Sequence, residues 1–249
     1  MTLLCTFFLF TTGAFAQEKI TVAFAANMEP VIRELSANFE KEHHCKVELV
    51  PGASGKLTAQ IKEGAPYDIF VSADMNFPEE LFKAGFTESA PKAYATGLLV
   101  LWSANADIHP SGDMKILLAP QIKKIAIANA RTAPYGAAAE AVLKYYNLYD
   151  KVKDKLVFGE NISQTEQFVE TQAAEIGFIA KSFVMTDKLK NIGHWAEIDK
   201  KVYTPIVQGA VLLSKGKTGH NGQLVHQFFD YLYSIKAKSV LEKFGYLVP

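Results

Sequence analysis

The stretch ITVAFAANMEPVIRELSANF, residues 20–39, decides the fold. Its first part, Ile20–Ala25, is a short apolar run that begins with a β-branched residue, which is typical of a buried parallel strand. Apolar residues then recur at the spacing of one helix face: Met28, Ile32, Leu35 and Phe39. Asn27 is a favourable N-cap for this helix, and Pro30 is tolerated in its first turn. The stretch therefore predicts a strand followed directly by an amphipathic helix.

The same alternation of strand and helix continues along the chain. Further strand-like runs lie at residues 46–50, 68–72, 98–103, 124–128, 156–158, 175–180 and 206–213. Helix-like runs begin at Ser54, which can serve as an N-cap, and at Pro78, Tyr135 and Ser163, and the end of the chain is helical over residues 222–244. Repeated strand–helix–strand units predict an α/β fold with parallel sheets that helices cover on both faces.

The number of strand–helix units favours two doubly wound α/β lobes over a single sheet. Because no low-complexity linker separates them, we expect the chain to cross between the lobes through ordered strands, near Leu98 and near Ile206. This division assigns residues 17–97 and 207–249 to lobe I and residues 98–206 to lobe II. A ligand would bind in the cleft between the lobes, since open α/β sheets bind ligands at the carboxyl ends of their strands.

The composition excludes several classes of protein. The chain has 249 residues, with 26 basic and 26 acidic side chains and a formal net charge of zero. A nucleic-acid-binding protein usually has a basic surplus, and a disordered chain has fewer apolar residues than the 49% found here. Neutrality also argues against the capture of an anion by a long-range positive field. We therefore expect a globular protein that binds no nucleic acid.

The first sixteen residues, MTLLCTFFLFTTGAFA, carry no charge. Their apolar part is too short to span a bilayer, and it leads into the small-x-small pattern Ala14-Phe15-Ala16. This pattern predicts a secretory signal peptide over residues 1–16 and therefore an exported protein. Once the signal peptide is removed, Cys45 is the remaining thiol of the two cysteines in the chain, so no intramolecular disulfide is expected.

Strand-to-helix turns are the places where binding chemistry is expected. Three turns put small residues or a capping residue where a strand meets a helix: FAANM at 24–28, PGASG at 51–55 and APYGA at 133–137. A fourth candidate turn, residues 160–163, precedes the helix at Ser163. A helix N-terminus offers unpaired N–H groups and a partial positive charge, so it favours anions. The alternative is that these turns are ordinary helix caps, which any α/β protein needs.

Other motifs are weaker. The segment Gly52–Leu57 fails as a phosphate loop, because Val50 stands where that motif needs a glycine. His43-His44-Cys45 lacks the spacing of metal ligands. Asp68 and Asp74 flank a strand end and could form a catalytic pair, although helix capping and hydrogen bonding between lobes are simpler roles. Since no nucleophile or cofactor pattern stands out, we predict no catalytic residue, no cofactor and no metal bonded directly to the protein.

One run of sequence is more specific than the rest, namely GAPYDIFVSAD at residues 64–74. Supporting runs are TVAFAAN at 21–27, GASG at 52–55 with AQI at 59–61, LVLWS at 99–103, residues 125–129 with APYG at 133–136, IGF at 176–178 and PIVQ at 205–208. Together these runs cover nearly all of the chain after the predicted signal peptide. In them the chain resembles the periplasmic molybdate/tungstate-binding proteins of ABC importers.

The resemblance implies a fold like that of type II periplasmic binding proteins, with two α/β lobes joined by two crossing strands and closing on one tetrahedral oxyanion. It implies ligand contacts at five residues: Ala26, Asn27, Ser54, Tyr135 and Ile162. Asn27 stands where some members have a serine that contacts the anion, so either its backbone N–H or its side-chain amide would donate here. Ala180 stands where some members have a tyrosine, so we expect that hydroxyl contact to be missing.

The resemblance also implies a transport role, with no enzymatic activity and no cofactor. A monomer in the periplasm would capture molybdate or tungstate and deliver it to the permease of an ABC transporter. Backbone N–H and hydroxyl groups, rather than Lys or Arg, would hold the dianion. Two alternatives stay open. One is the same fold binding sulfate, phosphate or a small carboxylate, the last with Arg131 as its partner; the other is a secreted hydrolase that uses Asp68 or Asp74 with a histidine.

Overall fold

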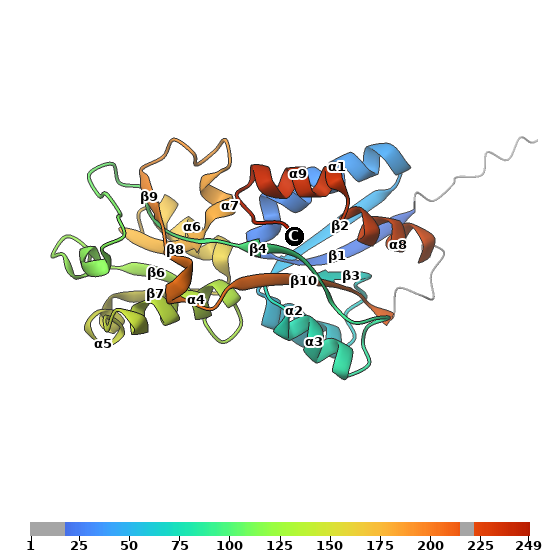
Figure 1. The fold of residues 1–249 in the computed structure, drawn as a ribbon, viewed down its shortest axis with the longest axis horizontal. Coiled ribbons are helices and arrows are strands. Elements are labelled where there is room, and N and C mark those ends of the chain that lie inside the picture. Colours follow the sequence, from blue (N-terminus) through green and yellow to red (C-terminus); the bar gives the residue numbers. More distant parts are fainter. Residues whose placement is uncertain (1–17, 215–221) are drawn as a thin grey trace, which may run out of the picture.

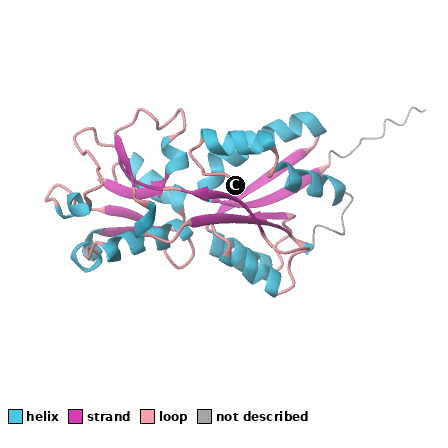
Figure 2. Cartoon of the chain, viewed as in Figure 1, coloured by secondary structure: helices cyan, strands magenta, loops and turns pink. Residues whose placement is uncertain are grey.

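The chain folds into two α/β lobes that lie side by side (Figure 1), as predicted. The computed structural model describes residues 18–214 and 222–249, so the predicted signal peptide over residues 1–16 lies outside the described residues. Each lobe is built on a five-stranded sheet with helices on both sides of the strands (Figure 2). Within the described ranges, no helix is long and apolar enough to cross a membrane.

The first sheet has the strand order β2-β1-β3-β10-β4. Its strands are β1 Lys19–Ala25, β2 Lys46–Gly52, β3 Ile69–Val71, β4 Lys92–Gly97 and β10 Ile206–Leu212. The helices around it are η1 Ala26–Met28, α1 Glu29–His43, α2 Ser54–Lys62, α3 Asn76–Lys83, α8 Gly222–Tyr231 and α9 Ile235–Lys243. The region predicted to be helical, residues 222–244, contains two helices, and Ser234 begins α9 by accepting a hydrogen bond at Oγ from the N–H of Ala237, 3.1 Å away.

The second sheet has the strand order β7-β6-β8-β5-β9. Its strands are β5 Leu99–Ser103, β6 Ile125–Ala128, β7 Leu156–Gly159, β8 Ile176–Ala180 and β9 His194–Glu197. The helices around it are η2 Met114–Leu118, α4 Pro134–Tyr145, α5 Tyr149–Val152, η3 Lys153–Lys155, α6 Ile162–Glu170, α7 Lys181–Val184 and η4 Lys200–Val202.

Both sheets are mixed, so the prediction of parallel sheets is wrong in part. β1 runs parallel to β2 and β3, and β6 runs parallel to β7 and β8. In contrast, β10 is antiparallel to β3 and β4, and β5 is antiparallel to β8 and β9. The chain leaves the first sheet after β4, enters the second in β5 and returns in β10 (Figure 1). A strand that arrives from the other lobe enters its sheet from the cleft side, which reverses its direction.

Two strands, β4 and β9, were not predicted. Their sequences, KAYATG and HWAE, are short and contain charged residues. Each lies at the edge of its sheet, where it pairs with one neighbouring strand, β10 for β4 and β5 for β9. Thr96 of β4 also forms an antiparallel bridge with Leu247. Their extended form therefore comes from pairing with a distant strand and not from a continuous apolar run.

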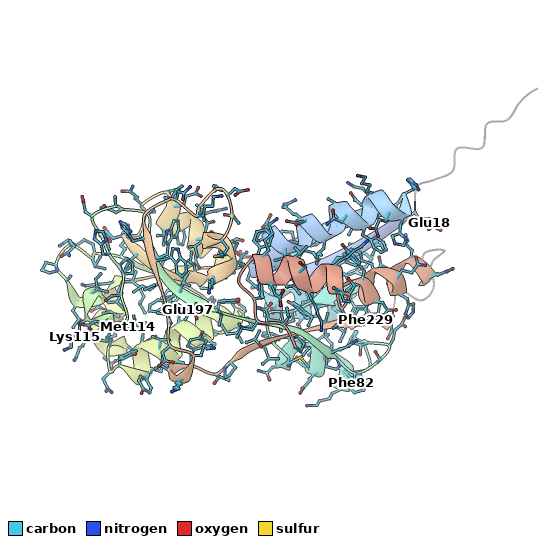
Figure 3. The ribbon with its side chains drawn as sticks, turned by 45° about the horizontal axis from the view of Figure 1, so that its top comes forward. Glu18, Phe82, Met114, Lys115, Glu197 and Phe229 are labelled. Atoms are coloured by element: carbon cyan, nitrogen blue, oxygen red, sulfur yellow. The ribbon has the colours of Figure 1, made fainter. Side chains whose placement is uncertain are left out.

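The hydrophobic core reaches across the boundary between the lobes. The first sheet has one apolar cluster on each face, because alternate residues of its strands point to opposite sides. The core of the second lobe includes four alanines from the first lobe: Ala25, Ala26, Ala53 and Ala73. Side chains fill both lobes (Figure 3), with Met114, Lys115 and Glu197 in the second and Phe82 and Phe229 in the first. Packing of the four alanines against the second lobe shows that the two lobes are closed on each other.

Candidate ligand-binding site

Helices from both lobes begin in the space between the two sheets. In the first lobe, η1 and α2 follow the carboxyl ends of β1 and β2, and η1 continues directly into α1. In the second lobe, α4 and α6 follow the carboxyl ends of β6 and β7. The first N–H groups of a helix have no acceptor within it and carry partial positive charge. The two lobes therefore present hydrogen-bond donors to the same space.

These helix N-termini surround a small cavity between the two lobes. Its lining contains all five residues for which ligand contacts were predicted: Ala26, Asn27, Ser54, Tyr135 and Ile162. The other lining residues are Ala25, Gly52, Ala53, Ala73, Ala133, Pro134 and Asn161. Most of these side chains are small, so the backbone approaches the cavity closely. Since Asn27, Ser54 and Tyr135 are each at most 1% exposed, a ligand at this site would be enclosed.

Ser54 is the first residue of α2 and has a free hydroxyl proton. Its predicted role as the N-cap is wrong, because Ala53 holds that position and no side chain caps the helix. Instead, Oγ of Ser54 accepts a hydrogen bond from the N–H of Ala73, 3.0 Å away. This bond uses a lone pair of the hydroxyl, so its proton can be donated to a ligand. The N–H of Ser54 is a second donor, because it has no acceptor within the helix.

Asn27 is fully buried, and its side-chain amide already has partners. Its predicted role as the N-cap of α1 is wrong, because Met28 holds that position and η1 contains Asn27. Nδ2 of Asn27 donates to Oε1 of Gln208 and to the hydroxyl of Tyr246, both at 2.9 Å. These bonds use both amide hydrogens, which leaves the backbone N–H as the donor that Asn27 can offer to a ligand. Oδ1 of Asn27 has no hydrogen-bond partner among the described residues.

Tyr135 offers its backbone to the cavity. It follows Pro134, which has no N–H, so Tyr135 supplies the first donor of α4. Its hydroxyl accepts a hydrogen bond from Nε2 of Gln208 at 3.2 Å and also interacts with the hydroxyl of Tyr246, so it has partners outside the cavity. Burial raises the pKa of the Tyr135 phenol well above its usual range, so the group is neutral. An anion in the cavity would therefore meet the N–H of Tyr135 and no charge from its side chain.

The N-terminus of α6 completes the set of donors. The helix begins at Ile162, one residue before the predicted start at Ser163. Asn161 is its N-cap and accepts a hydrogen bond at Oδ1 from the N–H of Gln164, 3.0 Å away. The cap satisfies an N–H further along the helix, so the N–H of Ile162 is left for a ligand. Across the cleft, Ser163 Oγ lies 3.5 Å from the carbonyl oxygen of Ala26 and donates a long hydrogen bond to it.

No charged side chain is among the described residues that line the cavity. Arg131, the candidate partner of a carboxylate ligand, is exposed on the loop before α4 and is not part of the lining. Its backbone N–H donates to Oδ1 of Asn129 at 3.0 Å. The cavity therefore has hydrogen-bond donors for an anion but lacks a guanidinium group that would form a bidentate pair with a carboxylate.

The carboxylates of Asp68 and Asp74 accept hydrogen bonds from other residues of the first lobe. Oδ2 of Asp68 accepts a hydrogen bond from the N–H of Thr21 at 2.7 Å, and burial raises the pKa of Asp68. Oδ1 of Asp74 accepts from the N–H of Phe77 at 3.2 Å and from Oγ of Ser72 at 3.1 Å, and burial raises its pKa too. These are structural bonds, so the geometry does not support a catalytic aspartate pair. Over 18–214 and 222–249, no group of three or more His, Cys, Asp or Glu could hold a metal ion.

Two contacts close the lobes beside the cavity. Nζ of Lys56, in α2, lies 2.7 Å from Oε1 of Glu160, which precedes α6. The N–H of Gly55 donates to the carbonyl oxygen of Thr132 at 2.9 Å. A Cβ at position 55 would lie 2.8 Å from the ring of Phe77 and 3.1 Å from Cα of Thr132, so glycine allows this close approach. The structure is therefore that of a closed cleft.

Sequence reasoning missed the polar residues that surround Asn27 and Tyr135. They are Gln208, Tyr94, Tyr246 and Ser182, all buried. Gln208 had a usable signal, because it is a polar residue inside the apolar run 206–213. The others had none, since their partners are remote: Tyr94 bonds a residue 114 positions away, Tyr246 one 219 positions away and Ser182 one 155 positions away.

Comparison with known proteins gives a consistent result. Residues 20–247 match the family model described as bacterial extracellular solute-binding protein. The chain is 39% identical over 229 residues to the molybdate-binding protein ModA of Azotobacter vinelandii, which covers 92% of this chain and 89% of that one. It is 35% identical over 233 residues to ModA of Rhodobacter capsulatus, with 93% and 89% covered. Among solved structures, the Azotobacter vinelandii periplasmic molybdate-binding protein superposes with a TM-score of 0.86 at 32% sequence identity, over 92% of this chain and 99% of that chain.

Proposed function

The chain belongs to the family of bacterial extracellular solute-binding proteins, and from that premise we propose that its solute is molybdate or tungstate, bound as the tetrahedral oxyanion. The family is one of solute-binding proteins, so we propose a transport role and no enzymatic activity for this chain. The relatives at 39% and 35% identity are molybdate-binding proteins. One structural observation carries the proposal: an enclosed cavity that receives helix N-termini from both lobes and has no charged side chain among its described lining residues.

The donors of the cavity suit a fully deprotonated anion. Burying a dianion without hydrogen-bond partners is very costly. Here the N–H groups at four helix N-termini and the hydroxyl of Ser54 can replace its water shell. Since no carboxylate lines the described cavity to accept a proton, a protonated phosphate would lose one hydrogen bond on entering. The donor set therefore favours molybdate and tungstate over phosphate.

Selectivity against other anions follows from size and from the missing arginine. Sulfate has the same charge and shape as molybdate but is smaller, so a rigid, closed cavity can discriminate between them by the lengths of the hydrogen bonds. A small carboxylate is normally bound by a guanidinium group, and Arg131 is exposed outside the cavity. The residues that line the site therefore disfavour a small carboxylate, and the titration with sulfate tests the discrimination by size.

We place the protein in the periplasm as a monomer that delivers the anion to the permease of an ABC transporter. Export follows from the predicted signal peptide over residues 1–16. Closure of the two lobes would accompany binding, because the donors come from both sides of the cleft. The permease would then recognise the closed, loaded form. The net charge of zero agrees with a protein that binds no nucleic acid.

Calorimetric titration with molybdate, tungstate, sulfate and phosphate tests the proposal. We expect strong binding of molybdate and tungstate at one site per chain and much weaker binding of sulfate and phosphate. Affinity should depend only weakly on NaCl concentration, because local dipoles hold the anion and the chain has no net positive charge. Heat of binding on titration with sulfate, together with no heat on titration with molybdate, would overturn the assignment.

A further inference from the structure

Gln208 lies on one of the two strands that connect the lobes. In the first sheet, Gln208 of β10 pairs with Ala95 of β4, and Ile206 pairs with Gly97 at the last residue of β4. The chain passes between the lobes beyond these paired ends (Figure 1). Gln208 is 0% exposed, which is unusual for a glutamine, so its amide must find hydrogen-bond partners inside the protein.

The partners of Gln208 come from both lobes. Oε1 accepts hydrogen bonds from Nδ2 of Asn27 at 2.9 Å and from the hydroxyl of Tyr94 at 2.7 Å. Asn27 and Tyr94 belong to the first lobe and hold the amide in one orientation. Nε2 of Gln208 donates to the hydroxyl of Tyr135 at 3.2 Å, and Tyr135 belongs to α4 of the second lobe. One buried amide therefore ties the two lobes together.

Gly97 leaves the space that the Tyr135 hydroxyl occupies. A Cβ at position 97 would lie 2.0 Å from that hydroxyl oxygen and 2.4 Å from Nε2 of Gln208. No side chain can be accommodated at position 97 while the phenol is in this place. The glycine at the end of β4 therefore allows a residue of the second lobe to reach the two connecting strands.

Tyr135 joins this contact to the ligand cavity. Its backbone lies at the N-terminus of α4, in the lining of the cavity, while its phenol reaches Gln208. The start of α4 is packed tightly on β6, because a Cβ at Gly136 would lie 2.3 Å from the carbonyl oxygen of Ala128. α4 must therefore move with the second sheet, and the phenol of Tyr135 moves with it.

We propose that the hydrogen bond from Gln208 to the Tyr135 hydroxyl is a catch made when the lobes close, and that both are positioning residues that set how long the oxyanion stays enclosed. The first lobe holds Gln208 and the second carries Tyr135, so the bond stabilises the closed arrangement and is lost on opening. The bond aligns the backbone N–H of Tyr135 with the cavity, while the Tyr135 side chain does not contact the ligand. The inference rests on the proposed function for the choice of anion used to test it.

The variant Tyr135→Phe tests the catch, because it keeps the ring and the backbone N–H and removes only the hydroxyl. In a chase of bound radiolabelled molybdate with excess unlabelled molybdate, we expect release to become roughly three- to tenfold faster, the effect of one buried hydrogen bond. The association rate should stay within about twofold, because the open form meets the ligand first. Gln208→Met removes the same bond and also takes the Oε1 acceptor from Asn27 and Tyr94, so we expect release at least as fast as in Tyr135→Phe. The double variant should release no faster than the faster single variant.

Tyr67→Phe is the matched control. The hydroxyl of Tyr67 donates to Oε1 of Gln60 at 3.0 Å, and both residues belong to the first lobe, so its loss should leave both rates unchanged. Thermal melting of each variant without ligand establishes that it folds. A Tyr135→Phe release rate within twofold of wild type, or fully additive effects in the double variant, would overturn the catch. If wild type binds another oxyanion but not molybdate, the proposed function is wrong. The release rates of wild type and variants are then compared with that anion, which tests the catch separately.

Discussion

Lys56 and Glu160 form a salt bridge between the two lobes, with 2.7 Å between Nζ and Oε1. The two residues are 104 positions apart in the chain, one in α2 and the other ahead of α6. Their side chains are 53% and 57% exposed. Exposed ion pairs contribute about 0–1 kcal/mol and are screened by salt, so this pair is a weak closing contact and not the source of ligand affinity.

The variant Lys56→Gln should therefore weaken molybdate binding by no more than about fivefold at low ionic strength. In about 0.5 M NaCl the difference from wild type should vanish, because screening already removes the contact. Titration calorimetry at the two salt concentrations measures both effects. A loss greater than about tenfold that persists in high salt would instead mean that Lys56 interacts with the anion itself.

Removal of the Ser54 hydroxyl should have a larger effect. Ser54→Ala deletes a donor to the anion and also leaves the N–H of Ala73 without its acceptor. We expect binding to weaken by about 1–3 kcal/mol, the range for a hydrogen bond to a charged group, with the backbone N–H of residue 54 retained. Calorimetric titration of the variant with molybdate gives the value.

Ser36→Ala is the matched control for Ser54→Ala. Ser36 is a buried serine of α1, 4% exposed, whose Oγ has no hydrogen-bond partner among the described residues. Its replacement should leave molybdate affinity unchanged. Equal affinities of wild type and Ser54→Ala, with Ser36→Ala also unchanged, would remove the Ser54 hydroxyl from the site.

The sequence predicted most strands and helices within a few residues, because apolar periodicity is a local property. It failed where structure depends on distant partners. β4 and β9 are edge strands that extend by pairing with β10 and β5. The position of the break between α8 and α9 was not predicted, because no glycine or proline marks residues 231–235 and the cap at Ser234 is a weak signal.

The site was predicted in part. The structure brings the five predicted residues into one cavity, although contact of each with an anion stays a prediction. The roles of Asn27 and Ser54 as caps were wrong, because they depend on the first residue of a helix, which sequence patterns locate only within one or two residues. The bond between Asn27 and Gln208 spans 181 positions, and no local pattern reveals such a pair.

Glu166 should make stability depend on pH. Glu166 is 7% exposed, and its Oε1 has no hydrogen-bond partner among the described residues. Burial raises the pKa of Glu166 to about 7 from 4.5; Glu170 also raises it, and Lys188 opposes the change. A raised pKa means that the folded state binds more protons than the unfolded state between these values, so the free energy of unfolding falls as pH rises from 4.5 to about 7.

We therefore expect Glu166→Gln to stabilise the protein at pH 8, by at most roughly 3 kcal/mol, and to have little effect near pH 4.5. Thermal unfolding of wild type and variant across this pH range provides the measurement. Glu170→Gln is a useful comparison, because it removes a neighbouring charge and keeps Glu166. Identical pH profiles for wild type and Glu166→Gln would show that Glu166 has an ordinary pKa in the folded protein.

Gly97→Ala should block closure of the lobes. The added Cβ would lie 2.0 Å from the Tyr135 hydroxyl oxygen and 2.4 Å from Nε2 of Gln208. Opening of the lobes moves the phenol away and relieves the first clash, whereas the flexible end of the Gln208 side chain must shift in either arrangement. We expect molybdate affinity to fall by about 1–3 kcal/mol, the usual cost of overpacking, while the melting temperature without ligand changes less. Gly112→Ala is the control, because a Cβ at position 112 meets nothing within 4 Å.

Combining Gly97→Ala with Tyr135→Phe should restore part of the affinity lost in Gly97→Ala, since the nearest clashing atom is gone. If Gly97→Ala binds as tightly as wild type, the Tyr135 hydroxyl does not enter this space when the lobes close on the ligand.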